Sequence, residues 1–217
     1  MTVDGRGMLR SVQVGTPHVL EEPDRWVTAF FKASVEGPVR LCAENLEGDR
    51  QADLTVHGGP DKAVCVYSAD HYDDWRRHLG AAPEGPAWFG ENFTVAGHTE
   101  WTVSIGDVYR VGTALVEVAQ PRGPCWKLGR RWQRPDMQKL VIQSGRSGWY
   151  LRVRDEGVVQ AGDALTLVEP PSPQWTIALV NELTYQHNIT AQTRMLRQEL
   201  ATCPALADNW RGELAQR

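Results

Sequence analysis

The 217-residue sequence lacks any apolar run close to the roughly 18 residues that a membrane-spanning helix requires. Its first residues, MTVDGRGMLRSVQVG, have acidic side chains and glycines where a secretory signal would have a basic start and an apolar core. These two absences predict a cytoplasmic protein with no membrane partner.

Cysteine is scarce, and no two of the four cysteines form a C-x-x-C pair. This spacing argues against a zinc knuckle, a disulfide scaffold and an iron–sulfur cluster, so each cysteine is expected to be a free thiol. Cys42 and Cys65 fall in apolar stretches that resemble strands, and Cys203 falls between expected helices. We interpret these three as packing residues and treat Cys125 separately.

Basic residues are too few for a protein that wraps duplex DNA. The 23 Lys and Arg residues are outnumbered by 27 Asp and Glu residues, which gives a formal net charge of −4. Duplex binding requires clustered cations, whereas recognition of a single base or nucleotide does not. The sequence also has no G-x-S-x-G elbow, no H-E-x-x-H pair, no P-loop and no G-x-G-x-x-G fingerprint.

Short β-branched and apolar segments recur between Gly, Pro and Asp residues from residue 8 to about residue 170. About eight short strands of this kind are typical of a closed β-barrel. A helix is expected over 69–79, with Ser68 as its cap, and a second helical stretch over 125–143. The expected strands cover residues 9–14, 39–43, 63–67, 92–95, 107–111, 114–119, 149–153 and 164–168.

The segment EPPSPQ, near residue 170, marks a change from strands to helices. Ser172 is a candidate N-cap, and Pro173 suits the first position of a helix. In the second of the helices that follow, Met195 and Leu200 lie on an expected apolar stripe and Arg197 faces away. The three expected helices cover 175–186, 189–201 and 207–215.

These patterns predict a mainly β protein. Residues 1–170 would form a barrel with peripheral helices, and residues 171–217 a small segment of three helices. Such a segment is too small to bury much core alone. It is therefore expected to pack on the barrel or on a partner protein.

The first candidate site is the segment HGGPDKAV, which begins at His57. Gly58 and Gly59 allow the backbone to turn sharply and to approach a ligand closely. His57 and Lys62 flank that turn and can donate to a phosphate or to a heteroaromatic ring, and Asp61 can orient either one. Taken alone, the segment fits an ordinary hairpin turn with solvated side chains better.

The second candidate site is the segment QPRGPCWKL, whose two prolines stiffen a loop around Cys125. A helix is expected to begin at this cysteine, and Arg122 and Lys127 are the nearest of four cations that also include Arg130 and Arg131. Cations and a helix N-terminus favour the thiolate, which binds metals and attacks electrophiles. A buried structural cysteine is the alternative, but the coincidence of these features favours a functional one.

Two further residues carry weaker signals. Asn92, in GENFTV, offers both a donor and an acceptor, although a turn that begins a strand explains it equally well. Lys32, in FKAS, is a single cation after an apolar stretch, and a solvated lysine is the simpler interpretation.

Six segments taken in order resemble the MOSC family, and within it the bacterial YiiM-like branch associated with resistance to N-hydroxylated purine analogues. The resemblance covers residues 8–169, and the tail is similar to the three-helix domain that follows the barrel in that branch. The six segments are GDRQAD at 48–53, HGGPDKAV at 57–64, HYDDW at 71–75, GENFTV at 90–95, QPRGPCWKL at 120–128 and GWYLRVRDEGVVQAGD at 148–163.

The resemblance implies a MOSC β-barrel that binds molybdenum cofactor, in which molybdenum is held by molybdopterin and by one cysteine thiolate. In this sequence the cysteine would be Cys125, a soft sulfur ligand. Near Lys32 the chain departs from the family pattern, because Ser34 stands in the position of a proline. The implied cofactor-binding residues are Lys32, His57, Gly58, Gly59, Asp61, Lys62, Asn92 and Arg122.

The resemblance further implies a molybdenum-dependent reductase that converts small N-hydroxylated compounds to amines. The sequence has no flavin or iron–sulfur motif, so a separate reductase is expected to donate the electrons. Two alternatives stay open. Cys125 would carry sulfur as a persulfide in a carrier of sulfur or cofactor, or Cys125 and His57 would form a metal-free nucleophile–base pair. Metal analysis distinguishes the three.

Overall fold

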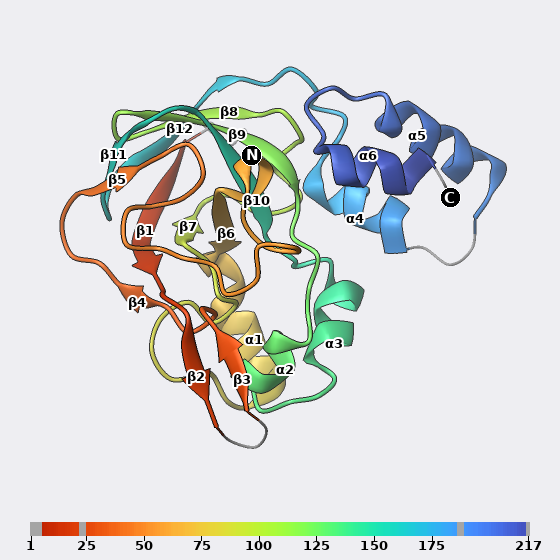
Figure 1. The fold of residues 1–217 in the computed structure, drawn as a ribbon. Helices are drawn as coiled ribbons and strands as arrows, with labels where there is room; N and C mark the ends of the chain where they lie inside the picture. The colour runs from red at the N-terminus through yellow and green to blue at the C-terminus, as the bar shows by residue number, and fades with distance from the viewer. Residues whose placement is uncertain (1–5, 22–24, 186–188, 216–217) are drawn as a thin grey trace.

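The computed structural model describes residues 6–21, 25–185 and 189–215, and its centre is a closed barrel of seven strands (Figure 1). The ring runs β12-β8-β9-β10-β6-β7-β1 and closes through pairing of β1 with β12. Its pairings are antiparallel except for the parallel pair β6–β7. The strands are β1 (Arg6–Val14), β6 (Val64–Ser68), β7 (Phe93–Ala96), β8 (Val108–Val111), β9 (Ala114–Pro121), β10 (Trp149–Asp155) and β12 (Ala164–Glu169).

The barrel interior explains why the apolar segments form these strands. Alternate residues such as Leu9, Val95, Val116 and Leu151 are almost completely buried in the main hydrophobic core. Burial of one face fixes the register, because a one-residue slip would turn these side chains outward. The mainly β class and the barrel expected from the sequence are therefore confirmed.

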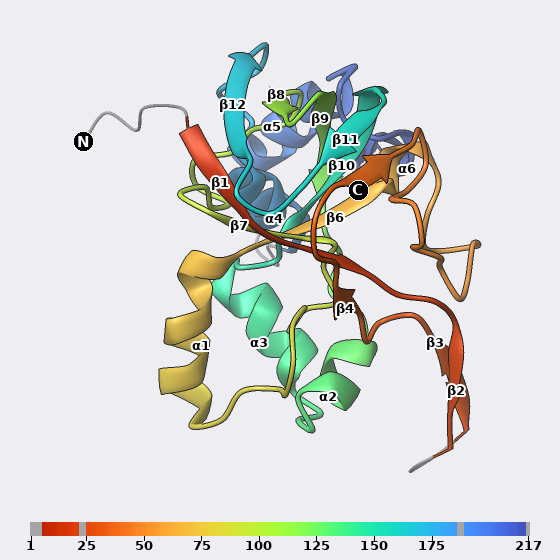
Figure 2. The same cartoon turned by 90° about the vertical axis from the view of Figure 1, so that its left-hand side faces the viewer.

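Five short outer strands complete the sheet structure of the described residues. β4 (Ala33–Ser34) pairs with the end of β1, and β5 (Val39–Leu41) pairs with β11 (Gly157–Val159). β2 (His18–Leu20) and β3 (Trp26–Thr28) form a two-stranded hairpin that extends away from the barrel (Figure 2). This hairpin is followed by Phe30 and Lys32, which border the pocket described below.

Three helices form a second core beside the barrel (Figure 2). They are α1 (Tyr72–Leu79), α2 (Lys127–Arg131) and α3 (Met137–Ser144). The expected helix over 69–79 is present as a 3-10 turn followed by α1, and Ser68 Oγ accepts from the Asp70 backbone N–H at 3.3 Å. The helical stretch expected over 125–143 is divided into α2 and α3 in the structure. It is interrupted because Gln133 adopts a φ of 49° and Pro135 follows it.

The C-terminal helices are α4 (Ile177–Tyr185), α5 (Ala191–Ala201) and α6 (Asp208–Ala215). α4 begins later than predicted, because Ser172 and Pro173 lie in a turn in which the Trp175 N–H donates to the Ser172 carbonyl. Thr176 is the cap, and its Oγ1 accepts from the Leu179 N–H at 3.2 Å. Residue 186, the predicted end of this helix, lies outside the described residues.

The C-terminal helices pack on the barrel and share its core. The Ile177 N–H donates to the Val103 carbonyl at 2.9 Å, and the Ala207 N–H donates to the Ala119 carbonyl at 3.0 Å. Trp175 and Trp210 belong to the same hydrophobic cluster as the barrel interior. Within the described part of the chain, none of the helices is long and apolar enough to cross a bilayer.

One feature of α5 contradicts the sequence prediction. Arg197, expected to face solvent, is only 2% exposed, and its Nε donates to the Leu183 carbonyl at 2.6 Å. Met195, expected on the apolar stripe, is 69% exposed, whereas Leu200 is buried as predicted. The arginine is buried because it satisfies a carbonyl near the end of α4, where the helix has no internal donors left.

Candidate functional site

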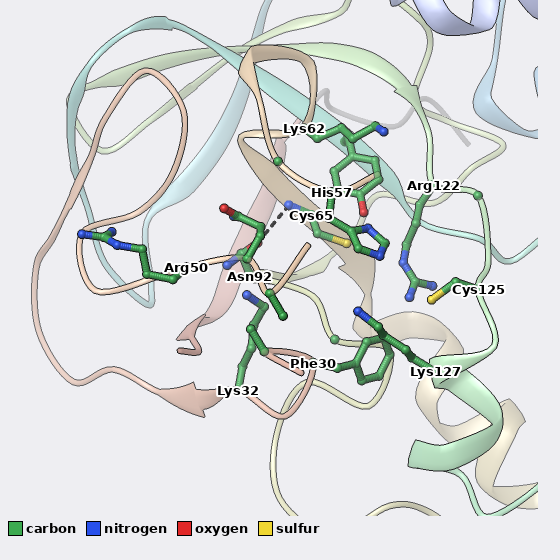
Figure 3. A pocket seen from close by; sticks show the side chains of 17 residues that line it. Phe30, Lys32, Arg50, His57, Lys62, Cys65, Asn92, Arg122, Cys125 and Lys127 are labelled. Carbon is green, nitrogen blue, oxygen red and sulfur yellow. Dashed lines mark hydrogen bonds between the residues drawn. The ribbon is translucent and has the colours of Figure 1, made fainter. Parts of the chain in front are cut away.

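A pocket lies where β6 and β10 begin and β9 ends (Figure 3). Four further stretches of the chain line it, at 29–32, 50–62, 90–92 and 122–127. It encloses about 600 Å³, including its open mouth. Seven of the nine residues proposed from the sequence line it, although more than 90 residues of chain separate the first from the last. These seven are Lys32, His57, Gly58, Lys62, Asn92, Arg122 and Cys125.

The other two proposed residues, Gly59 and Asp61, are not among the lining residues in the described chain. Gly58 and Gly59 have φ values of 85° and 84°, which confirms the expected sharp turn. Asp61 Oδ1 lies 2.9 Å from Arg152 Nε, so the ion-pair partner of this carboxylate in the described chain is Arg152 rather than His57 or Lys62. The turn, rather than Asp61, aligns the pocket residues on either side of it.

The pocket is strongly cationic. Five lysines and arginines line it, and none of its lining residues within the described chain is acidic. In Figure 3 these side chains come from several sides of the same space. Such a concentration of positive charge attracts an anionic ligand. The five cations are Lys32, Arg50, Lys62, Arg122 and Lys127.

Arg122 is the most deeply buried of these cations, with 4% exposure just after the end of β9. Its backbone N–H donates to the Gly148 carbonyl at 3.0 Å, and its guanidinium lies over the ring of Phe30 at 5.8 Å. Its Nη1 is buried and has no hydrogen-bond partner among the described residues. A buried charged donor without an acceptor is costly, and it indicates that the site is completed by a ligand.

Cys125 is a half-buried free thiol in the same pocket, beside the Arg122 guanidinium (Figure 3). The sequence predicted that a helix begins at Cys125, and this prediction is wrong. α2 starts two residues later and spans only five residues, so the helix dipole contributes little. The positive charges near Cys125 therefore come from the lysine and arginine side chains of the pocket rather than from a helix N-terminus.

Cys65 also lines the pocket, although the sequence indicated packing alone. It is 6% exposed, and burial raises the pKa of its thiol to about 11. Cys65 therefore stays protonated near neutral pH and differs in character from the more accessible Cys125. Packing remains the description that fits Cys65.

His57 is neutral at physiological pH. Burial, followed by the nearby charges of Lys127 and Arg122, lowers its pKa from 6.5 to about 4. A neutral imidazole has one donor and one acceptor nitrogen. His57 can therefore hydrogen-bond a heteroaromatic ligand, while the lysines and arginines supply the positive charge.

Asn92 links two barrel strands by hydrogen bonds at the wall of the pocket. Its Oδ1 accepts from the Cys65 N–H at 3.2 Å, and its Nδ2 donates to the Gln13 carbonyl at 3.1 Å. These bonds tie β6 to β1 across the start of β7. The sequence left two interpretations of Asn92 open, a ligand contact and a turn that begins a strand. Both agree with the structure, because Asn92 lines the pocket and directly precedes β7.

Sequence reasoning assigned no role to several residues of the site. Asp49 is fully buried beside Lys32, while Arg50, Gln51 and Tyr150 line the pocket. The first three belong to GDRQAD, a segment that was part of the resemblance but had no clear chemistry of its own. Tyr150 stands opposite Cys65 in the β10–β6 pairing, a relationship that only the sheet register reveals.

Comparison with known proteins places this geometry in a family. The model for the MOSC domain matches residues 53–166. YflK of Bacillus subtilis (strain 168) is 41% identical over 210 residues, which cover 95% of this chain and 92% of that protein. YiiM of Escherichia coli (strain K12) is 41% identical over 160 residues, which cover 72% of this chain and 71% of that protein.

A solved structure and a longer fungal protein extend the comparison. The crystal structure of YiiM from Geobacillus stearothermophilus matches with a TM-score of 0.80 and 35% identity, covering 97% of this chain and 98% of that one. A protein of Gibberella moniliformis (strain M3125 / FGSC 7600) named "Reductase" is 36% identical over 75% of this chain, which spans only 29% of the fungal protein. The chain therefore belongs to the MOSC domain family and to its YiiM-like branch.

Proposed function

We propose that the pocket binds molybdenum cofactor and that Cys125 provides the thiolate ligand of the metal. The observation that supports this best is a free, half-buried thiol among five cations, with no acidic residue lining the same pocket in the described chain. A phosphorylated pterin with a dithiolene group is an anion, and a soft metal site favours a sulfur donor. Cytoplasmic conditions would keep the thiol reduced.

The residues present fit such a ligand. Arg122 Nη1 is a buried donor without a partner among the described residues, and an anionic oxygen would satisfy it with a charge-assisted bond. Lys32 and Lys62 would supply further positive charge to phosphate or pterin oxygens. His57, the Gly58 backbone and Asn92 would line the pterin, while Gly59 and Asp61 would act from outside the pocket by setting the turn and its ion pair with Arg152.

The proposed reaction is the two-electron reduction of an N-hydroxylated compound, R–NHOH + 2 e⁻ + 2 H⁺ → R–NH₂ + H₂O. The N–O bond breaks, a new N–H bond forms, and the oxygen leaves as water. The bound cofactor would supply the redox chemistry. This chain would position the substrate, exclude bulk water and hold the ligand thiolate, and a separate reductase would deliver the electrons. The fungal relative named as a reductase supports the direction of the reaction.

Analysis of anaerobically purified protein tests this proposal. We expect about one molybdenum and one pterin per chain, the stoichiometry that a single Cys125 ligand implies. Labile sulfur on Cys125 without molybdenum would instead support a carrier of sulfur or cofactor. Neither sulfur nor metal, together with activity that thiol alkylation abolishes, would support a metal-free Cys125–His57 enzyme.

The Cys125→Ala variant tests the ligand role directly. It should lose reduction of a hydroxylaminopurine while retaining the wild-type circular dichroism spectrum, because the thiol is only half buried. Cys42→Ala is the matched control, since Cys42 is also a half-buried free thiol but does not line the pocket. Full activity of Cys125→Ala would exclude Cys125 as the metal ligand.

A further inference from the structure

A second cavity adjoins the pocket proposed for the cofactor. It encloses about 1030 Å³, including its open mouth. Five residues line both spaces, so the Cys125 side chain lies at the boundary between them. The five shared residues are His57, Lys62, Gly123, Cys125 and Tyr150.

The wall of the second cavity opposite the barrel comes from the C-terminal helices. α4 contributes Thr184 and Tyr185, and α6 contributes Asn209, Trp210 and Glu213. The end of α4 lies close to the loop that carries the cysteine, because a Cβ placed on Gly123 would be 3.9 Å from the Tyr185 hydroxyl. The cavity therefore depends on the packing of these helices on the barrel.

Gln120 is an unusual residue in this cavity. It lies near the end of β9, opposite Tyr150, and it is 1% exposed. Its Oε1 has no hydrogen-bond partner among the described residues, although the side chain lines the second cavity. Proteins rarely bury an amide oxygen without a partner, so the position is suited to a ligand that donates a hydrogen bond.

Gln120 and Arg122, two positions apart in the chain, each bury a polar atom that has no hydrogen-bond partner among the described residues. Arg122 offers a buried donor to the first pocket, and Gln120 offers a buried acceptor to the second. A ligand that satisfies Arg122 must bring an acceptor, preferably an anionic one. A ligand that satisfies Gln120 Oε1 must bring an N–H or O–H group.

We propose that the second cavity is the substrate subsite and that the Gln120 side-chain amide recognises the nitrogen-bearing edge of the substrate, an inference that rests on the proposed function. The substrate class is a neutral, flat heteroaromatic base or its nucleoside, with the N-hydroxylated nitrogen attached next to a ring nitrogen. A glutamine amide accepts from an exocyclic N–H and donates to an adjacent ring nitrogen, which is how glutamine recognises adenine.

The other walls fit this class of ligand. Trp126 is 52% exposed and, together with the buried Trp210, provides flat apolar surface for an aromatic ring. α6 contributes the Glu213 carboxylate, and the lining residues from the C-terminal helices in the described chain include no cation. Lys62 lies on the barrel side of the cavity, so selection against a phosphate would come from the helical wall alone. We expect bases and nucleosides that contact this wall to bind better than nucleotides.

The Gln120→Met variant tests the inference by binding alone. Methionine has a similar volume but lacks the amide. Titration calorimetry with adenine, the product expected from 6-hydroxylaminopurine, requires neither an N–O bond nor turnover. We expect the Kd for adenine to rise at least about tenfold, the effect expected when both hydrogen bonds of a bidentate amide contact are lost. Gln160→Met, at an exposed glutamine, should leave the Kd unchanged.

Thermal stability separates recognition from a structural role. If Gln120 serves recognition, Gln120→Met should keep or raise the Tm, because it removes a buried acceptor that has no described partner. A clear drop in Tm together with loss of adenine binding would indicate a structural residue and would overturn the inference. Unchanged adenine affinity would overturn it as well.

Turnover by molybdenum-loaded protein distinguishes this inference from the proposed function. Gln120→Met should lower kcat/KM for 6-hydroxylaminopurine at least about tenfold. It should lower kcat/KM by a smaller factor for phenylhydroxylamine, which offers an N–H to Oε1 but has no ring nitrogen for Nε2. Its molybdenum content should equal that of the wild type. Equal losses on both substrates would overturn the subsite alone, whereas a wild type without molybdenum or turnover would overturn both proposals.

A second variant probes the helical wall. Wild-type protein should bind adenosine at least about tenfold more tightly than adenosine monophosphate, because the acidic Glu213 is among the residues that line the cavity. Glu213→Gln should reduce this preference by improving the affinity for the nucleotide. Equal affinities of the wild type for the two ligands would overturn the predicted selection against phosphorylated substrates.

Discussion

The ammonium nitrogen of Lys32 lies 2.5 Å from Oδ1 of Asp49, and both side chains are almost completely buried. The same Oδ1 accepts the backbone N–H of Gly15 at 2.8 Å. Asp49 therefore holds Lys32 at the pocket before any ligand binds and offsets part of its charge. Arg122, which has no such acidic partner in the described chain, is then the cation best placed to bind an anionic oxygen strongly.

We expect Asp49→Asn to lower the free energy of unfolding by about 3–5 kcal/mol, because it leaves the buried Lys32 charge without its counter-ion. Asparagine keeps an acceptor for the Gly15 N–H, so the change isolates the ion pair. Urea denaturation measures the effect. Asp155→Asn, at an exposed position on β10, should change stability by less than about 0.5 kcal/mol.

Equal stabilities for wild type and Asp49→Asn would contradict this account of the pair. A loss of molybdenum without a loss of stability would also contradict it, since Asp49 would then act on the cofactor alone. The outcome matters for Lys32, because its position in the pocket depends on this ion pair.

Arg122→Met should reduce the molybdenum and pterin that remain bound after gel filtration. Charge-assisted bonds to phosphate or carbonyl oxygens contribute about 1.5–3 kcal/mol each, so the affinity should fall roughly 10- to 100-fold. The stability of the cofactor-free protein should change little or increase, because Nη1 is buried without a described partner. Arg110→Met, at an exposed position on β8, is the matched control. Unchanged molybdenum retention would show that Arg122 does not hold the cofactor.

His57 should make stability depend on pH. Burial, and to a lesser extent the nearby cations, lowers the pKa of the folded-state imidazole from 6.5 to about 4. Between these two pH values the unfolded chain protonates His57 while the folded protein keeps it neutral. The unfolded state then binds more protons, so stability is lost as the pH falls from about 6.5 to about 4.

Urea denaturation at pH 7.5 and at pH 5 checks this effect. Wild-type protein should lose more stability between these two conditions than His57→Asn, which cannot titrate. The same substitution at His18, exposed on β2, should retain the wild-type difference. If His57→Asn and wild type lose the same amount, the imidazole is not kept neutral by its surroundings.

The fold could be predicted where the core imposes a pattern. The segment expected over 114–119 becomes β9, and the one expected over 9–14 becomes β1, because one face of each strand fills the barrel. The hairpin of β2 and β3 could not be predicted in this way. Val19 and Val27 are 42% and 52% exposed, so burial imposes no alternation on these three-residue strands.

The candidate site was predictable where a local motif carries the chemistry. The cysteine loop contains Arg122 and Cys125 within four residues, and both line the pocket. Gln120, in the same motif, has no visible role until the C-terminal helices close a cavity around it. Asp49 was missed for a related reason, since its partner Lys32 lies 17 residues earlier in the chain.

Arg197 is buried in the structure, although the helical pattern predicted that it would face solvent. Its Nε–H donates to the Leu183 carbonyl at 2.6 Å from a position only 2% exposed, so it joins α5 to the end of α4. Arg197→Met should cost about 1.5–3 kcal/mol of stability, the contribution of a hydrogen bond from a charged donor. Arg194→Met, on the exposed side of the same helix, should cost less than about 0.5 kcal/mol.

The effect of Arg197→Met should extend to ligand binding. Thr184 and Tyr185, which follow Leu183 at the end of α4, line the second cavity. A loosened α4 would hold this wall less firmly, so the affinity for adenine should fall along with the Tm, while molybdenum retention, which depends on the barrel pocket, should stay the same. Loss of molybdenum in parallel with adenine would instead mean that the two cavities form one binding unit that the helices stabilise as a whole.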